Sequence, residues 1–262
     1  MGMHSLSIDD WLLVDEHRDA DLAYKAELLE RARPVVFAAE PGSEPASAEL
    51  LAAVRKWLAA HGVGVAEPVG DEHPLIEAAR LVQEDLAVLQ LVDGHWVLTA
   101  GVVAFPTHWT VSDKVGLALE GIHAPVAHYE TELRERVDRF HDRLTVDRPA
   151  WRRNWFVLPT SELHLPAFGH RLHVADGITD DGRPMWIRSE RQTLRRLPES
   201  DAIVFTIRVQ QAPLGVLRAR PDLAAKMLAA TRSWDREKRM YTATGGVLGE
   251  LIQWLANAAD VD

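Results

Sequence analysis

The segment that sets the fold class is Leu86-Ala-Val-Leu-Gln-Leu-Val92, then Asp93-Gly94, then His95-Trp-Val-Leu-Thr-Ala-Gly-Val-Val-Ala-Phe105. Two apolar runs flank an Asp-Gly pair, which is a strong short-range signal for a β-hairpin. Pro106 follows directly, and because proline has no backbone N–H to donate, it ends the strand. The sequence therefore predicts an antiparallel hairpin over residues 86–105.

Further strands are predicted after the hairpin. Residues 155–158 are a short apolar run, and Met185-Trp-Ile-Arg188 alternates less cleanly. The β-branched segment Ala202–Val209 is typical of a central strand that ends at Pro213 and Leu214. Alternation of one strand with one helix is missing, and so is the glycine fingerprint of a dinucleotide-binding fold. We therefore expect an α+β fold with a mostly antiparallel sheet.

Helices are predicted on both sides of this strand-rich part. Leu22, Ala26, Leu29 and Ala32 lie near helical spacing, and Ser47 is a candidate N-cap for a helix that ends at Gly62. Ser112 is a candidate cap for a short helix through Leu119. Longer helices are expected over residues 129–144, 223–232 and 247–258.

Composition excludes several function classes. The chain has no cysteine, so a disulfide, a zinc–thiolate site and a cysteine-ligated iron–sulfur cluster are excluded. A formal charge of −10 argues against nucleic-acid or anionic-membrane binding. The N-terminal residues carry acids where a signal peptide carries bases. We expect a cytoplasmic protein that binds neither nucleic acid nor membrane.

Histidine and tryptophan are abundant, with twelve and nine residues. No His-Glu-x-x-His motif is present, and the pairs His170/His173 and His123/His128 fall in loop-like sequence. A surface or hydrogen-bonded role is the more common fate of any one of these histidines. Five tryptophans fall in the strand-rich part, where core packing or a pocket wall would both suit them, at positions 96, 109, 151, 155 and 186.

One charged run is unusual for its position. Arg188-Ser-Glu-Arg-Gln-Thr-Leu-Arg-Arg-Leu-Pro198 follows an apolar strand and precedes another. A solvated helix with weak Glu–Arg pairs is one interpretation. The alternative is that its polar groups face something specific, with arginines holding carboxylates in bidentate fashion.

The order of several short blocks resembles the haem-dependent oxidative N-demethylase family. The most specific block is Glu190-Arg-Gln-Thr-Leu-Arg-Arg-Leu-Pro198 followed by Ala202-Ile-Val-Phe-Thr-Ile-Arg208. The supporting blocks, in order, are Leu81-Val-Gln-Glu-Asp-Leu86, Phe105-Pro-Thr-His-Trp109, Asp113-Lys-Val-Gly116, Ile122-His-Ala-Pro-Val126, Val137-Asp-Arg-Phe140 and Arg153-Asn-Trp155. The resemblance runs from about Trp11 to the C-terminal helix.

The resemblance implies a single haem-binding PAS-like domain over residues 1–262, with helical additions at about 1–80 and 215–262. It implies haem b as cofactor and the oxidative removal of a methyl group from a small secondary or methylated amine. O2 and external electrons would be consumed and formaldehyde released. The chain would be the haem-bearing subunit, with a flavin and iron–sulfur reductase subunit as partner or with self-association.

The resemblance also points to site residues. His123, in the Ile-His-x-Pro-Val block, is the expected axial ligand of the haem iron, and His164 is the reserve; a cap at a helix end is the plain alternative for His123. Glu190 is the expected catalytic residue, by holding the amine or moving protons, although an internal salt bridge would also suit it. Cations for the haem propionates are expected among Lys114, Arg191, Arg196 and Arg208.

The chain departs from the family pattern at two places. Ala127-His128 stand where Pro-Gly is common, and Val209-Gln210 stand where Thr-Tyr is common. These departures leave three other functions open: a PAS-like haem or ligand sensor without turnover, a haem oxygenase for a different amine, and a family member that has lost haem.

Overall fold

The computed structural model describes residues 2–65, 72–124, 134–166, 177–235 and 247–260. Its centre is a seven-stranded sheet with the order β1-β5-β6-β7-β3-β4-β2. The strands span His4–Ser5 (β1), Phe37–Ala39 (β2), Asp85–Val92 (β3), His95–Val102 (β4), Ala150–Leu158 (β5), Trp186–Arg196 (β6) and Ile203–Pro213 (β7). The pairs β1–β5, β2–β4, β3–β4 and β3–β7 are antiparallel. The predicted α+β class with a PAS-like antiparallel sheet is confirmed.

The helices flank these strands in sequence. They span Arg18–Arg31 (α1), Arg33–Val36 (α2), Glu44–Ala60 (α3), Pro74–Ala79 (α4), Leu119–His123 (α5), Arg134–Arg143 (α6), Pro221–Arg232 (α7) and Leu248–Ala258 (α9). Short 3₁₀ turns cover Ile8–Asp10 and Leu214–Ala219. The helices predicted before residue 62 and after residue 221 are thus confirmed, whereas Tyr129 and Leu133 lie outside the described residues.

The predicted hairpin is formed by β3 and β4. Asp93 and Gly94 both have positive φ values, 50° and 82°, as a tight two-residue turn between twisted strands requires. β3 also pairs with β7, so the predicted strand Ala202–Val209 is central in the sheet. Buried aliphatic side chains of both strands, such as Leu86, Val88 and Val204, form the core at this point.

Two predicted helix starts are wrong. α3 begins at Glu44 rather than after Ser47, because Pro45 is compatible with a first turn and the Glu44 carboxylate accepts the Gly42 N–H at 2.9 Å. The helix predicted from Ser112 through Leu119 does not form, because a helix, α5, begins only at Leu119. There the chain turns at Gly116, whose φ is 85°, and the Leu98 N–H donates to the Leu117 carbonyl at 3.0 Å, which ties the segment to β4.

The charged run around residues 188–196 is also not a solvated helix. It is part of β6, and its residues from Glu190 to Leu194 are buried. Side chains alternate between the two faces of a strand. Leu194 packs with Ile203 and Phe205 on one face, whereas Thr193 bonds the Thr206 hydroxyl at 2.7 Å on the other. β6 and β7 therefore have one face that carries Gln192, Leu194 and Arg196 and one that carries Arg191, Thr193 and Arg208.

The chain divides into two compact units. Unit 1 comprises Met1–Arg153, Leu163–Ala167 and Arg191–Arg208, and unit 2 comprises Asn154–Glu162, Phe168–Glu190 and Val209–Asp262. β5, β6 and β7 each contribute residues to both units. The interpretation as a single domain with helical additions stays a prediction.

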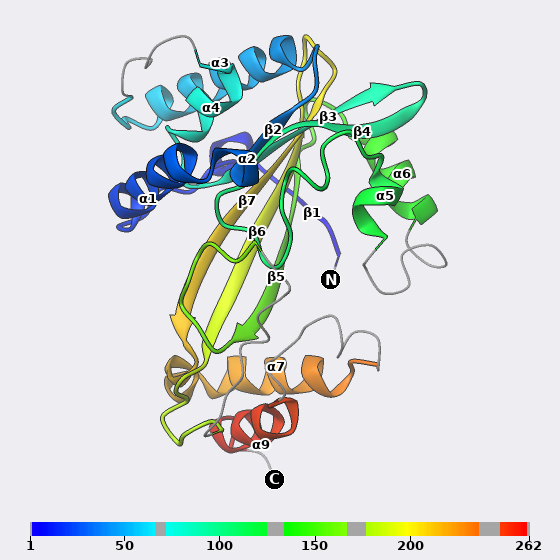
Figure 1. Cartoon of the computed structure of the whole chain (residues 1–262). Coiled ribbons are helices and arrows are strands. Elements are labelled where there is room, and N and C mark those ends of the chain that lie inside the picture. The colour runs from blue at the N-terminus through cyan, green and yellow to red at the C-terminus, as the bar shows by residue number, and fades with distance from the viewer. Residues whose placement is uncertain (1, 66–71, 125–133, 167–176, 236–246, 261–262) are drawn as a thin grey trace. The chain divides into compact units, whose positions relative to one another are not determined.

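Unit 1 contains α1 to α6. Figure 1 shows α5 and α6 beside the β3–β4 hairpin, away from α1, α3 and α4. A hydrophobic cluster, which we call the hairpin cluster, joins α5 and α6 to the Leu194 face of the sheet; its buried members are Leu89, Trp96, Leu119, Leu144, Ala150, Leu194 and Ile203. Ile122, Val137 and Phe140 pack against it.

Unit 2 contains α7 and α9, which pack through Leu228, Leu251 and Leu255. The Trp254 indole N–H donates to the carbonyls of Thr179 and Asp180, both at 3.1 Å. Gly182 has a φ of 87°, and a Cβ atom there would lie 2.7 Å from the Gly215 nitrogen. A glycine is therefore required at this close approach.

Candidate functional site

His123 is the last residue of α5. It lies one turn after Leu119, and its Nδ1 bonds the Leu119 carbonyl oxygen at 2.8 Å. A carbonyl only accepts, so Nδ1 carries the proton and the lone pair of the ring is on Nε2. Burial lowers the pKa of His123 to about 4, and the charges of Arg152 and Lys114 act in the same direction. At neutral pH the imidazole is therefore neutral, which is the form that ligates a metal.

Lys114 lies in the turn that precedes α5. Its ammonium donates to the Ile122 carbonyl at 2.8 Å, so a cation is fixed one residue from His123. Burial lowers the pKa of Lys114, while Asp113 opposes that shift. The structure thus brings together two of the residues that the sequence singles out.

Two further residues of this region were missed at the sequence level. His141 is buried on α6, and Arg152 lies on β5, where its Nε donates to the Gln192 side-chain oxygen at 2.7 Å. Arg152 lowers the pKa of both His123 and His141, although burial is the larger cause for each. A sequence signal existed for both, because His141 follows Val137 and Phe140 on one helical face and Arg152 directly precedes the Arg153-Asn-Trp155 block.

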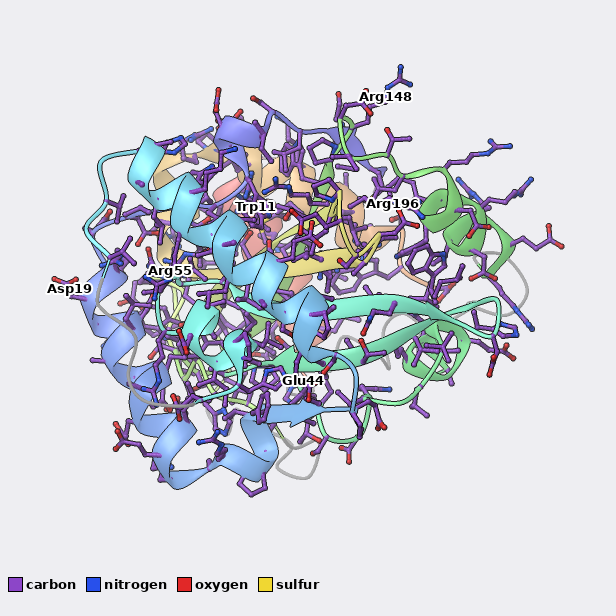
Figure 2. All side chains as sticks on the ribbon, turned by 90° about the horizontal axis from the view of Figure 1, so that it is seen from above. Trp11, Asp19, Glu44, Arg55, Arg148 and Arg196 are labelled. Carbon is purple, nitrogen blue, oxygen red and sulfur yellow. The ribbon has the colours of Figure 1, made fainter. Side chains whose placement is uncertain are left out.

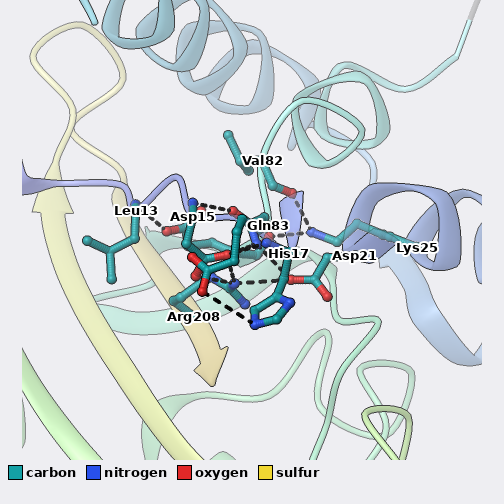
Figure 3. Close-up of polar contacts among 10 residues, drawn as sticks. Leu13, Asp15, His17, Asp21, Lys25, Val82, Gln83 and Arg208 are labelled. Atoms are coloured by element: carbon teal, nitrogen blue, oxygen red, sulfur yellow. Dashed lines mark hydrogen bonds and ion pairs between the residues drawn. The ribbon is translucent and has the colours of Figure 1, made fainter. Parts of the chain in front are cut away.

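Arg208 lies on the other face of the sheet, in a buried network (Figure 3). Its Nη2 contacts Asp15 at 2.7 Å and Asp21 at 3.1 Å. Gln83 bonds the same two carboxylates, at 2.9 and 2.7 Å. The charge of Arg208 is therefore already balanced by carboxylates of the chain.

Lys25 completes this network. It is fully buried, and its ammonium donates to the carbonyls of Val82 at 2.8 Å and Glu84 at 2.6 Å. Burial lowers the pKa of Lys25 to about 8, against the attraction of Asp85 and Glu84. These contacts join α1 to the segment that leads into β3.

Arg191 shares that face of the sheet. Its guanidinium donates to the backbone carbonyls of Trp11, at 3.0 Å, and Asp10, and lies 5.7 Å from the Trp151 ring centroid. It therefore ties the N-terminal segment to the sheet. The structure does not bring Arg191 together with His123, since Arg191 lies opposite the Leu194 face on which α5 packs.

Arg196 lies on the same face as Leu194, toward α6 (Figure 2). It binds Asp201 in bidentate fashion, with both contacts at 2.6 Å, and donates to the Leu144 carbonyl at 2.9 Å. Its guanidinium also lies 5.3 Å from the Trp96 ring centroid. Trp96 is buried and donates to Asp142 at 2.9 Å, which indicates a packing role for this tryptophan.

His164, the reserve ligand, lies near the end of β4. Its Nδ1 bonds the Ala104 carbonyl at 2.7 Å, so it has the same tautomer as His123. The adjacent Leu165 pairs with Thr107. Hydrogen-bond geometry alone therefore does not distinguish the two candidate ligands. His123 differs in having two cations nearby, Lys114 and Arg152, whose charges add to burial in lowering its pKa.

Glu190 belongs to unit 2, where it is buried on β6. Val209 and Gln210 lie on β7 in the same unit. Ala127, His128, His170 and His173 lie outside the described residues. The catalytic role of Glu190 stays a prediction.

The donors around His123 fit a haem. Among the described residues, no group of three or more His, Asp or Glu side chains could hold a metal ion by itself. A haem supplies most ligands of its own iron and needs one or two from the protein, together with cations for its carboxylates. A neutral imidazole beside Lys114 and Arg152 offers both kinds of partner.

Comparison with known protein families gives a match over most of the chain. The model described as "Haem-dependent oxidative N-demethylase, alpha subunit-like" matches residues 63–248, well over half of the 262-residue chain. The matched span includes Lys114, His123, Arg152 and Glu190. Among the described residues, none of the helices has the length and apolar character needed to cross a bilayer.

Proposed function

Because this chain belongs to the haem-dependent oxidative N-demethylase, alpha-subunit-like family, we propose that it is a haem-binding enzyme subunit that removes a methyl group from a small secondary or methylated amine. The observation that carries the proposal is His123. Its N–H is fixed on the Leu119 carbonyl and its pKa is lowered to about 4 by burial, so the ring offers Nε2 to a metal at neutral pH.

Each neighbouring residue has a proposed role. His123 would hold the iron of a haem b, and its bond to the Leu119 carbonyl would orient the ring as the outer partner of a metal-bound histidine does. Lys114 and Arg152 would hold its propionates, as the cations whose charges act on His123. Arg196 and Arg208 are assigned to the structure instead, because carboxylates of the chain already balance their charges. Arg191 is assigned to the structure because it lies opposite the sheet face on which α5 packs.

Glu190 is the proposed partner of the substrate ammonium group. A buried carboxylate attracts a cation more strongly than an exposed one, since water screens it less. It can also accept a proton from the amine, so that the nitrogen lone pair is available when the methyl group is oxidised.

The bound haem would supply O2 activation. In the overall reaction the methyl carbon is oxidised to formaldehyde, and the C–N bond breaks to leave the demethylated amine. One oxygen atom of O2 ends in formaldehyde and the other in water, with two electrons and two protons consumed. We propose that the electrons come from a flavin and iron–sulfur partner subunit, because this chain contains no cysteine to ligate such a cluster.

The test is formaldehyde release by the haemin-loaded chain with an electron-donating reductase and a panel of methylated amines. We expect formaldehyde and demethylated amine in equal amounts for at least one amine. The variant Glu190→Gln keeps the size of the side chain but not its charge, and should raise KM for the amine. Haem binding without formaldehyde from any amine would overturn the enzymatic function and favour a sensor.

A further inference from the structure

α5 and α6 each carry, in the last turn, a histidine with the same local geometry. His123 bonds the Leu119 carbonyl and His141 bonds the Val137 carbonyl, in both cases through Nδ1 at 2.8 Å and across four residues. His141 is buried within its helix. The proton of each ring is therefore held by a carbonyl, and each ring has its lone pair on Nε2.

Both histidines lie on the helix faces that pack on the hairpin cluster. Residues four apart lie on one side of a helix. His123 lies four residues after Leu119, a buried member of the cluster. His141 lies four residues after Val137, which packs against the cluster, and three residues before Leu144, which is a buried member. Ala150 of β5 is also a member, and Arg152 lies two residues later on the same face of that strand. The three polar side chains thus gather at one cluster.

The charges in this region support that placement. Besides burial, the charge of Arg152 lowers the pKa of both rings, and His141 lowers the pKa of His123. Two imidazoles whose Nδ1 atoms are bound to carbonyls have their lone pairs on Nε2, which suits a Lewis acid. Neither ring can donate from Nε2 to bound O2 without losing its carbonyl bond.

The hydrogen bond alone is not specific to a metal site. His61 makes the same bond, from Nδ1 to the Trp57 carbonyl at 2.8 Å, at the exposed end of α3. What distinguishes His141 is its burial, its helix face and its common neighbour with His123. His61 is therefore the matched control for a histidine that only caps its own helix.

We propose that His141 would serve, together with His123, as a second protein ligand of the haem iron. The inference rests on the proposed function, because it needs a haem at His123. The resting ferric protein is then six-coordinate with two histidines, and O2 or any other external ligand has to displace His141 before it binds. Displacement by a ligand would make the α6 histidine a gate to the iron.

The experiment loads the full chain with haemin and records ferric absorption and electron paramagnetic resonance spectra. The wild type should be low-spin, and His141→Ala should become high-spin and return to low-spin when free imidazole is added. The CO association rate of the reduced protein should rise by at least about tenfold in His141→Ala. His61→Ala should match the wild type in all three readouts.

The outcomes separate this inference from the proposed function. A chain that binds haem and whose spectra and CO rate are the same in His141→Ala overturns the second ligand and leaves the haem function standing. A high-spin wild type does the same. Failure of the wild type to bind haemin overturns both. If His141→Ala does not fold, His141→Gln, which keeps a side chain of similar length, gives the same comparison.

Discussion

The buried side chain of Lys25 makes the free energy of unfolding of this protein change with pH in the alkaline range. The ammonium is fully buried, and burial lowers its pKa from 10.5 to about 8. Between these two pH values the unfolded chain binds more protons at this position than the folded chain. The free energy of unfolding therefore rises with pH in this window, and this contribution is lost as pH falls through about 8.

The magnitude follows from the shift. The difference between 10.5 and about 8 corresponds to about 3 kcal/mol at about 1.4 kcal/mol per pH unit, of which about 2 kcal/mol should be gained between pH 8 and pH 10. Lys25→Met removes the titrating group. At any one pH it also removes the donor from the Val82 and Glu84 carbonyls, so the change with pH is the informative quantity.

The assay is urea unfolding at pH 8, 9 and 10, followed by tryptophan fluorescence. The free energy of unfolding of the wild type should rise by about 2 kcal/mol relative to Lys25→Met across this range. Lys56→Met, at an exposed position of α3, is the control and should run parallel to the wild type. If Lys25→Met also runs parallel to the wild type, the reasoning about a buried ammonium is refuted.

Two further predictions concern stability. Arg208→Met should lower the free energy of unfolding by about 3–5 kcal/mol, because it leaves the Asp15 and Asp21 carboxylates without their cation. Adding Asp21→Asn should recover part of this loss, as measured by chemical unfolding. If the losses of the two single variants simply add in the double variant, the shared network is contradicted. Gly182→Ala should cost about 1–3 kcal/mol, since a Cβ atom would lie 2.7 Å from the Gly215 nitrogen at a φ of 87°. Gly94→Ala should lower the free energy of unfolding by less, because Gly94 has a φ of 82° but no atom within 4 Å of the position that a Cβ would take. Equal losses in the two variants would show that the close approach at Gly182 does not contribute.

Local signals in the sequence predict much of this fold. Asp93-Gly94 defines the β3–β4 hairpin because turn chemistry acts within two residues. Helical spacing locates α1, α3, α7 and α9 for the same reason. Ser112 misleads, because contacts of the following residues with β4 outweigh a capping preference.

The site is less predictable because its partners are distant in sequence. Arginine side chains usually face solvent, yet Arg191 and Arg196 lie in β6. Arg191 donates to the Trp11 carbonyl, 180 residues away, and Arg196 pairs with Asp201. The carbonyls that bind Lys25 lie 57 and 59 residues from it. His141 becomes a candidate ligand only when α5 and α6 are seen on one hydrophobic cluster.

The central claim is that His123 holds a haem in this chain, and the most direct measurement is titration of the apoprotein of residues 1–262 with haemin. We compare the wild type with His123→Ala and His164→Ala, whose rings have the same tautomer. His123→Ala should weaken haemin binding by at least about tenfold, whereas His164→Ala should bind as the wild type does. Unchanged affinity in His123→Ala, together with a loss in His164→Ala, would contradict the assignment and move the haem to His164.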